Sequence, residues 1–167
     1  TSVPHVYVIG DAKARNIQLA HVASAQGENA VAAILGQKPA LDLSVVPSCV
    51  YTNPEIASVG LTEEGAKAAG IPVKTGKYLT GANGKCLIEG TESGYVKLVT
   101  DQATGRILGA QIVGYEGVDK RIDVLATAMQ MGGKVTDLTE LDLAYAPPYS
   151  SAKDPVNIAG FMIDNIA

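Results

Sequence analysis

The sequence predicts an α+β protein in which helices pack on an antiparallel sheet. Segments with the short apolar or alternating pattern of strands follow one another, and short turn-forming segments separate them. A helical pattern comes after these segments. Strands first and helices afterwards are typical of an α+β unit. The strand-like segments are 48–52, 73–79, 86–88, 95–100 and 107–113.

Composition excludes several classes of protein. With 167 residues, 47% of them hydrophobic, the chain can bury a packed core, so disorder is not expected. The net charge of −4 and the lack of a basic run argue against nucleic acid or an anionic membrane surface as a partner. No apolar stretch approaches the roughly 20 residues that span a bilayer, and no basic leader followed by an apolar run opens the chain. We therefore expect a cytoplasmic protein whose partners are small molecules or proteins.

The first 46 residues indicate the end of a separate domain. The apolar run 6–9 predicts a buried strand that delivers Asp11 at its carboxyl end, where ligands bind in open α/β sheets. The pattern over 17–35 predicts a helix. This strand has no partner nearby in the sequence, so its sheet must come from elsewhere. We expect residues 1–36 to be the edge of one domain, 37–46 a connector, and 47–167 a complete second domain.

Turn and cap signals separate the elements of the second domain. Asn53-Pro54 marks a turn after the first strand, and Thr62 caps a short helix that Gly70 ends. Ala82-Asn83-Gly84 and the segment 101–105 are interpreted as hairpin connections. Residues 118–131 then predict a helix, with Glu116 four residues before Lys120 as an ion pair.

A stiff turn precedes the last predicted helix. Prolines fix the backbone of the segment 143–155, which carries Tyr145 and Tyr149, and a rigid turn of this kind can aim a side chain. Asp154-Pro155 is interpreted as a cap followed by a first-turn proline. The apolar face of the helix that follows consists of Val156, Ala159, Ile163 and Ile166.

The two cysteines predict no metal site. Cys49 and Cys86 are far apart in the sequence, and neither belongs to a C-x-x-C pair. We therefore expect thiols that are buried or idle.

Four motifs, in order, resemble the C-terminal third of FAD-dependent pyridine nucleotide-disulfide oxidoreductases. They are residues 6–11, Leu19-Ala20-His21, residues 51–60 and the segment around Tyr145. The resemblance implies an FAD domain with an NAD(P)H domain inserted into it, and a C-terminal interface domain that forms the homodimer. This chain would hold the last strand and helix of the FAD domain, followed by the interface domain.

The resemblance also assigns residues to the flavin. Gly10 and Asp11 match a motif in which the aspartate binds a ribityl hydroxyl, and an ionised carboxylate is a strong acceptor for such a group. Leu19 and Ala20 match the start of a helix whose amide end faces the pyrimidine ring of the flavin, where the helix dipole stabilises negative charge. These four residues are the candidates for cofactor binding.

The proline turn distinguishes branches of the family. Dihydrolipoamide dehydrogenases and glutathione reductases carry a His-Pro pair there, which forms a base with a glutamate, but Pro147 occupies the histidine position here and cannot exchange a proton. The first half of the chain looks more like dihydrolipoamide dehydrogenase. By contrast, segments 116–125 and 144–150 look like the branch of coenzyme A-disulfide reductases, NADH oxidases and persulfide reductases.

In coenzyme A-disulfide reductases two tyrosines reach into the active site of the partner subunit. Tyr145 matches one of them and Tyr78 the other, so both are candidate catalytic residues. A phenol can donate a hydrogen bond or a proton to a departing thiolate.

The sequence therefore predicts the C-terminal dimerisation portion of a flavoprotein that uses NAD(P)H and FAD to reduce a disulfide or persulfide. Coenzyme A disulfide is the preferred substrate, and residues 47–167 are expected to form the homodimer. Two alternatives stay open: an NADH oxidase with oxygen as the acceptor and, for these residues by themselves, a dimerisation module without catalysis. The redox cysteine would lie outside this chain, which is not expected to retain FAD or to be active by itself.

Overall fold

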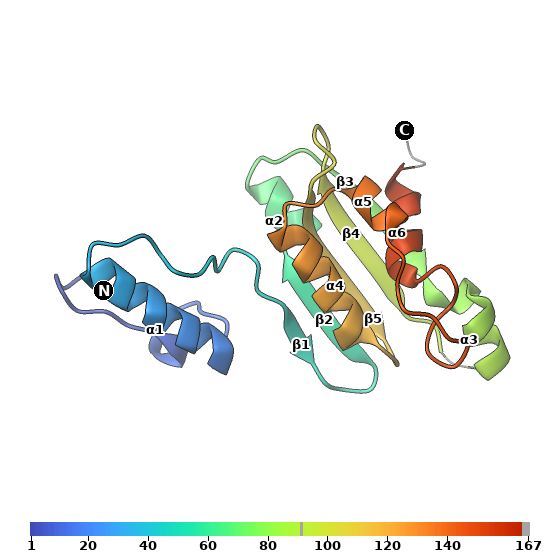
Figure 1. The fold of residues 1–167 in the computed structure, drawn as a ribbon, viewed down its shortest axis with the longest axis horizontal. Coiled ribbons are helices and arrows are strands. Elements are labelled where there is room, and N and C mark those ends of the chain that lie inside the picture. The colour runs from blue at the N-terminus through green and yellow to red at the C-terminus, as the bar shows by residue number, and fades with distance from the viewer. Residues whose placement is uncertain (91, 165–167) are drawn as a thin grey trace. The chain divides into compact units, whose positions relative to one another are not determined.

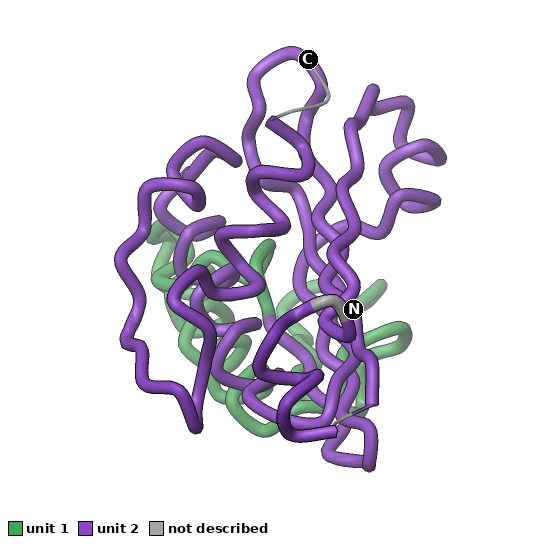
Figure 2. Tube along the Cα trace, turned by 90° about the vertical axis from the view of Figure 1, so that its right-hand side faces the viewer, with its two compact units in different colours: residues 1–46 green, residues 47–167 purple. Residues whose placement is uncertain are grey.

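The computed structural model describes residues 1–90 and 92–164. Within it the chain forms two compact units, Thr1–Val46 and Pro47–Ala167 (Figure 2). Among the described residues, none of the helices is both long and apolar enough to cross a membrane.

The larger unit is built on an antiparallel five-stranded sheet (Figure 1). Its strands lie in the order β1-β2-β5-β4-β3, and every neighbouring pair is antiparallel. The sheet and its helices confirm the predicted α+β class. The strands are β1 (Ser48–Val50), β2 (Glu55–Gly60), β3 (Val73–Leu79), β4 (Tyr95–Asp101) and β5 (Ile107–Gly114).

Helices cover one face of this sheet (Figure 1). Helix α4 (Val118–Gln130) packs on β2 and β5, while α6 (Pro155–Asp164) packs on β3 and β4 and against α5 (Val135–Glu140). Gly76 makes room for α6, because a Cβ built on it would lie 2.5 Å from Ile163 Cγ1. The core therefore lies between the sheet and these helices, and its largest fully buried side chains include Leu98, Ile122, Leu125 and Leu138.

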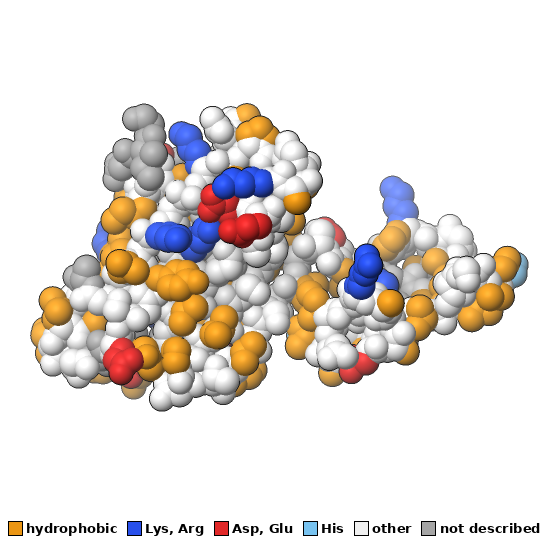
Figure 3. Space-filling view, turned by 180° about the vertical axis from the view of Figure 1, so that it is seen from behind, with side chains coloured by type: hydrophobic (Ala, Val, Ile, Leu, Met, Phe, Trp, Pro, Cys, Tyr) orange, Lys and Arg blue, Asp and Glu red, His pale blue; other side chains and the backbone are white. Residues whose placement is uncertain are grey.

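The opposite face of the sheet carries an apolar row that crosses all five strands. Each member is a register partner of the next: Val50, Ile56, Val113, Tyr95 and Leu79. Val50, Ile56 and Leu79 are exposed. Figure 3, which views the molecule from behind, shows hydrophobic side chains gathered over this face beside basic and acidic side chains. We call these five residues the apolar row.

The cap predicted at Thr62 is confirmed at the start of α2. A cap that was not predicted, at Asn83, explains why α3 was predicted as a strand. Helix α2 (Glu63–Ala68) follows Thr62, whose hydroxyl accepts a hydrogen bond from Gly65 N at 3.0 Å. The predicted strand 86–88 is wrong, because the segment belongs to helix α3 (Gly84–Glu89). Its cap is Asn83, which accepts from Lys85 N, so the predicted hairpin turn at Ala82-Asn83-Gly84 is a helix start.

The predicted ion pair between Glu116 and Lys120 is also absent from the described structure. Glu116 lies before α4, and Gly117 between them has a left-handed backbone with φ of 63°. The Glu116 carboxylate instead binds Lys85 Nζ at 3.0 Å.

The smaller unit departs from the sequence prediction at its start. Residues 6–9 form no strand and their side chains are exposed, because a strand needs a hydrogen-bonded partner and this unit contains none among its described residues. Helix α1 (Ala20–Ile34) is present but begins later than predicted, after the extended residue Leu19. The assignment of residues 1–36 to the edge of a cofactor domain stays a prediction.

The last helix begins where the sequence predicted. Asp154 Oδ1 accepts a hydrogen bond from Val156 N at 3.0 Å, which makes Asp154 the cap of α6. Val156, Ala159 and Ile163 are buried as expected, and Ile166 lies outside the described residues. Helix α5 was not predicted.

Candidate functional site

The segment between α5 and α6 is a tight, exposed turn that presents two tyrosines. We call residues 142–153 the tyrosine turn. Tyr149 N and Ser150 N both donate to the carbonyl of Ala146, at 2.8 and 3.1 Å, which folds the chain back on itself around Pro147 and Pro148. Tyr145 is 53% exposed and Tyr149 is 78% exposed. A surface turn therefore carries two phenol groups, as the sequence predicted.

Both ends of the tyrosine turn are fastened by the start of α6. The Asn157 side chain, which is buried, donates to the carbonyls of Leu138 and Leu141 at 2.8 and 3.0 Å, just before the turn. Its oxygen accepts from Asp154 N at 3.0 Å. At the other end, Ser150 Oγ donates to Asp154 Oδ2 at 2.8 Å.

Arg121 of α4 completes this buried network. Its Nε lies 3.0 Å from Asp154 Oδ1 and 3.2 Å from Oδ2, and its Nη1 donates to the carbonyls of Glu116 and Gly117. Burial by itself would raise the pKa of Asp154, but the hydrogen bonds from Arg121, Val156 N and Ser150, together with the Arg121 charge, lower it overall. Asp154, which is 2% exposed, is therefore an ionised carboxylate inside the domain.

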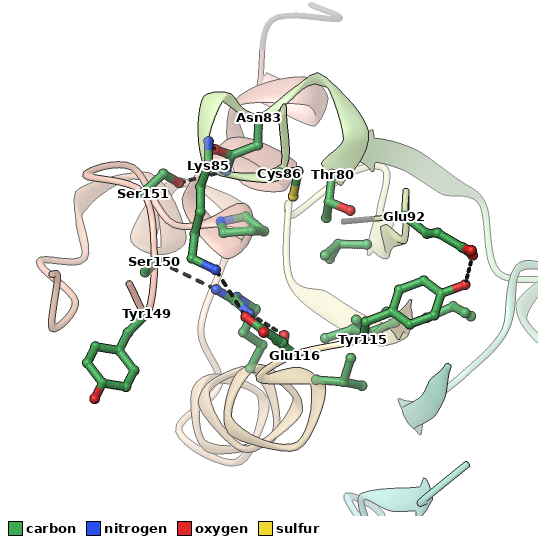
Figure 4. A pocket seen from close by; sticks show the side chains of 17 residues that line it. Thr80, Asn83, Lys85, Cys86, Glu92, Tyr115, Glu116, Tyr149, Ser150 and Ser151 are labelled. Atoms are coloured by element: carbon green, nitrogen blue, oxygen red, sulfur yellow. Dashed lines mark hydrogen bonds and ion pairs between the residues drawn. The ribbon is translucent and has the colours of Figure 1, made fainter. Parts of the chain in front are cut away.

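Helix α3 borders the tyrosine turn on its other side. Asn83 Nδ2 donates to Ser151 Oγ at 2.9 Å, and Lys85 Nζ binds Glu89 at 2.6 Å and Glu116 at 3.0 Å. These contacts surround a pocket of about 70 Å³ (Figure 4). The Tyr149 side chain points away from it (Figure 4). Both lysine contacts are ion pairs, so the positive charge of Lys85 is already compensated.

Tyr145 stands between two surface grooves. One groove runs between α3 and the turn and is lined by Ile88, Pro147 and Ser151 as well as Tyr145. The other groove is lined by Tyr145, Tyr149 and Lys120. A molecule that lies in either groove can reach the Tyr145 ring.

The structure does not place Tyr78 beside Tyr145. Tyr78 belongs to the helix-covered face of β3 and is only 8% exposed. Burial first, and the neighbouring Cys86 second, raise the pKa of its phenol, and the Asn83 side chain offsets part of this rise by hydrogen bonding. Tyr78 is therefore a neutral, buried phenol in the described structure. Its link to the tyrosine turn runs through Asn83, which also binds Ser151.

The four candidate cofactor residues lie on two parts of the smaller unit. Gly10 has a left-handed φ of 62°, and a Cβ there would lie 3.1 Å from Ala23 Cβ in the first turn of α1. This close approach explains a glycine at the position. Asp11 follows it in a short 3-10 turn and is exposed, while Leu19 and Ala20 form the start of α1. An exposed carboxylate and a free helix start fit one edge of a site for a polar, electron-accepting group.

The cysteines are separate from each other and from any metal-binding group. Cys49 and Cys86 are both free and partly buried. Burial, and then the charge of Asp123, raise the pKa of Cys49, so this thiol is a poor nucleophile at neutral pH. Across the residues that the structure covers, no three His, Cys, Asp or Glu side chains gather as metal ligands.

Sequence reasoning found the tyrosines but missed the groups that hold them. Arg121, Ser150, Asn157 and Asn83 were not singled out for this role. Ser150 lies only four positions from Asp154. The partners of the other three lie far away in the sequence: 33 positions separate Arg121 from Asp154, 19 separate Asn157 from Leu138 and 68 separate Asn83 from Ser151. Single-sequence patterns report neighbours within an element and cannot report such pairs.

Comparison with known proteins gives a consistent assignment. Residues 46–155 match the domain family described as "Pyridine nucleotide-disulphide oxidoreductase, dimerisation domain". The dihydrolipoyl dehydrogenase of Halobacterium salinarum is 42% identical over 138 residues, which cover 83% of this chain and 29% of that protein.

Two solved structures share the fold. The NAD-dependent persulfide reductase from A. fulgidus has a TM-score of 0.74 at 32% identity, covering 90% of this chain and 28% of that one. Bacillus anthracis CoADR-RHD has a TM-score of 0.75 at 37% identity, covering 99% and 31%. This chain thus spans about three tenths of the length of each.

Proposed function

We propose that this chain, which belongs to the pyridine nucleotide-disulphide oxidoreductase family and carries its dimerisation domain, is the dimerisation portion of a homodimeric flavoprotein that reduces a small disulfide or persulfide. FAD, when bound in the whole protein, supplies electron transfer from NAD(P)H to a redox-active cysteine outside this chain. The residues of this chain form the dimer and complete the disulfide site.

The observation that carries this proposal is the Tyr145 phenol, exposed on a turn whose ends are anchored in the core. The chain has two histidines, His5 and His21, and neither is near the turn in the sequence. An imidazole of this segment therefore cannot supply the proton at the substrate sulfur. The hydroxyl of Tyr145 can, since a phenol is both a hydrogen-bond donor and an acid.

The step assigned to Tyr145 is protonation of the leaving thiolate. A thiolate attacks one sulfur of the substrate disulfide, a mixed disulfide forms and the original sulfur–sulfur bond breaks. The departing sulfur carries the electron pair of the broken bond and takes the Tyr145 proton, and water then returns a proton to the phenolate. For a persulfide the departing group is hydrosulfide, and the same proton balance holds.

Two substrate classes have support. The structures named persulfide reductase and CoADR-RHD, a coenzyme A-disulfide reductase, align with 90% and 99% of the chain, which favours a coenzyme A disulfide or a persulfide. The relatives named dihydrolipoyl dehydrogenase favour a lipoyl group as a second candidate, and its oxidised form carries the disulfide that the step above would reduce. Turnover of the full-length protein with each substrate, measured beside oxygen consumption, separates these classes.

Rapid mixing of the full-length protein tests the role of Tyr145. In Tyr145→Phe we expect flavin reduction by NAD(P)H at the wild-type rate, and a disulfide step slower by about ten- to a thousandfold, the range for loss of one transition-state donor. Tyr149→Phe is the matched control, since it removes the same hydroxyl from the same turn and should leave both steps unchanged. An unchanged disulfide step in Tyr145→Phe removes the proposed function of this residue.

The dimer has support from the exposed surface. Val50, Ile56 and Leu79 of the apolar row, with Leu87 and Ile88 of α3, expose large apolar side chains that a monomer leaves in water. We expect residues 47–167 to form a two-fold dimer, because isologous contacts are the commonest closed symmetry. Sedimentation equilibrium over a wide concentration range tests this, and a strictly monomeric full-length protein contradicts it.

A further inference from the structure

The tyrosine turn is held before residue 142 and again at Ser150 and Ser151, where Ser151 Oγ accepts from Asn83 Nδ2. Residues 142, 144, 145 and 147–149 are exposed, whereas Ser150 is buried. Inside the turn, the backbone hydrogen bonds are those from Tyr149 N and Ser150 N to Ala146 O, and they hold its shape but not its direction. The direction of the turn relative to the sheet must therefore be set where its ends meet the core.

Both ends meet in one buried network centred on Asp154. The Asn157 side chain joins Leu141 O, before the turn, to Asp154 N, after it. The Asp154 carboxylate then binds Ser150 Oγ, at the end of the turn, and Arg121, which belongs to α4. Because α4 packs directly on β2 and β5, this chain of contacts connects the turn to the sheet of the domain.

The network is larger than a helix cap requires. Capping α6 needs only the bond from Val156 N to Asp154 Oδ1, at 3.0 Å. The second carboxylate oxygen, Oδ2, instead accepts from Ser150 Oγ at 2.8 Å and from Arg121 Nε at 3.2 Å. The Asp154 carboxylate, paired with Arg121, therefore binds the start of α6 through one oxygen and the turn through the other.

We propose that Ser150, held by the buried Arg121–Asp154 pair, is a positioning residue that aims Tyr145. Ser150 contacts no reacting atom, and its effect passes through the direction of the turn. This inference rests on the proposed function of Tyr145, and it adds the claim that α4 sets the geometry of the site through a single serine hydroxyl.

Hydrogen exchange in this chain tests the geometry without any enzyme assay. Ser150→Ala removes the bond that Ser150 Oγ donates to Asp154 and the longer one, 3.5 Å, that it accepts from Arg121 Nη2, and it leaves the ion pair and the α6 cap in place. We expect the amides of residues 149 and 150 to exchange about tenfold faster, and those of α4 around Leu125 to be unchanged. Ser150→Thr, which keeps the hydroxyl, should restore slow exchange. Unchanged exchange in the turn, or equal acceleration throughout the domain, overturns the proposal.

A double-mutant cycle in the full-length protein tests the link to Tyr145. Ser150→Ala should slow the disulfide step about tenfold when Tyr145 is present and leave flavin reduction unchanged. In the Tyr145→Phe background Ser150→Ala should have no further effect, because the group that it positions is gone. A residue that acts only on stability would give the same factor in both backgrounds, which refutes positioning.

The two proposals fail in different ways. If Tyr145→Phe alone leaves the disulfide step unchanged, the proposed function fails and the positioning claim fails with it. If Tyr145→Phe slows that step while Ser150→Ala does not, the function stands and only the positioning role of Ser150 is overturned.

Discussion

Replacing Arg121 by methionine tests how much the buried Arg121–Asp154 ion pair contributes to the free energy of unfolding. Methionine keeps the length and much of the apolar volume of the arginine stem, so the change is mainly the loss of the charge and its hydrogen bonds. Asp154 would keep its bonds from Ser150 and Val156 N but lose its only counter-charge among the described groups. The variant therefore leaves a poorly compensated carboxylate in the core.

The size of the effect follows from burial. The Arg121 and Asp154 side chains are 12% and 3% exposed, so this is not a surface pair. Removing one partner of a buried pair costs about 3–5 kcal/mol, and the two remaining donors place Arg121→Met near the lower end, about 3 kcal/mol at pH 7. Arg106→Met is the control, since Arg106 is exposed and its side chain has no ion pair in the described structure, and it should change stability by less than about 0.5 kcal/mol.

The stability difference between wild type and Arg121→Met should depend on pH. In the wild type the pKa of Asp154 is lowered, so its contribution is present above the unfolded value of about 3.9 and is lost as pH falls through the folded value. In Arg121→Met, burial still raises the pKa of Asp154, but the Arg121 charge and hydrogen bonds that lowered it are gone. The folded carboxyl therefore binds a proton more readily than the unfolded one. Acidification therefore stabilises the variant relative to the wild type.

Urea unfolding followed by far-ultraviolet circular dichroism measures this difference, since the chain has no tryptophan to report by fluorescence. We expect the gap between wild type and Arg121→Met to be about 3 kcal/mol at pH 7 and to shrink between pH 7 and pH 4. A gap below about 1 kcal/mol at pH 7, or one that stays constant down to pH 4, would show that the buried ion pair does not stabilise the domain.

Three further predictions concern single side chains: one in the core, one at a helix cap and one at the candidate cofactor site. Ile122→Ala, on the buried face of α4, should destabilise the domain by about 2–5 kcal/mol in the same urea assay, whereas Met131→Ala, at an exposed site, should change it little. Thr62→Ala should cost about 1 kcal/mol and Thr62→Ser much less, because the lost bond is the α2 cap to Gly65 N. In the full-length protein, Asp11→Ala should lower flavin content measured by absorbance, since it removes a charged acceptor worth about 1.5–3 kcal/mol, and unchanged content would count against its assignment.

Local signals in the sequence predicted much of the fold. The strand Val73–Leu79 and the α2 cap at Thr62 were found where predicted, because alternation and capping act within a few residues. The run 86–88 was misassigned, since three apolar residues fit a strand or a helix equally and the Asn83 cap decides. Residues 6–9 have strand composition but no strand partner among the described residues, so composition by itself misled.

The candidate site was predictable only in part. A stiff proline turn with an exposed Tyr145 could be predicted, because proline acts on its own backbone. The burial of Tyr78 could not, since it depends on which face of β3 the helices cover. The Arg121–Asp154 pair was equally hidden, because the sheet topology, and no local pattern, brings α4 beside the start of α6.

Hybrid dimers of the full-length protein test the proposal that Tyr145 completes the disulfide site of the partner subunit. One subunit carries Tyr145→Phe with an intact redox cysteine, and the other carries Tyr145 with that cysteine replaced by serine. If Tyr145 acts across the dimer, the cysteine of the first subunit meets the Tyr145 of the second, and each hybrid has one intact site. We expect disulfide turnover at half the wild-type rate per hybrid dimer, whereas turnover no faster than that of Tyr145→Phe homodimers would show that Tyr145 does not act across the dimer.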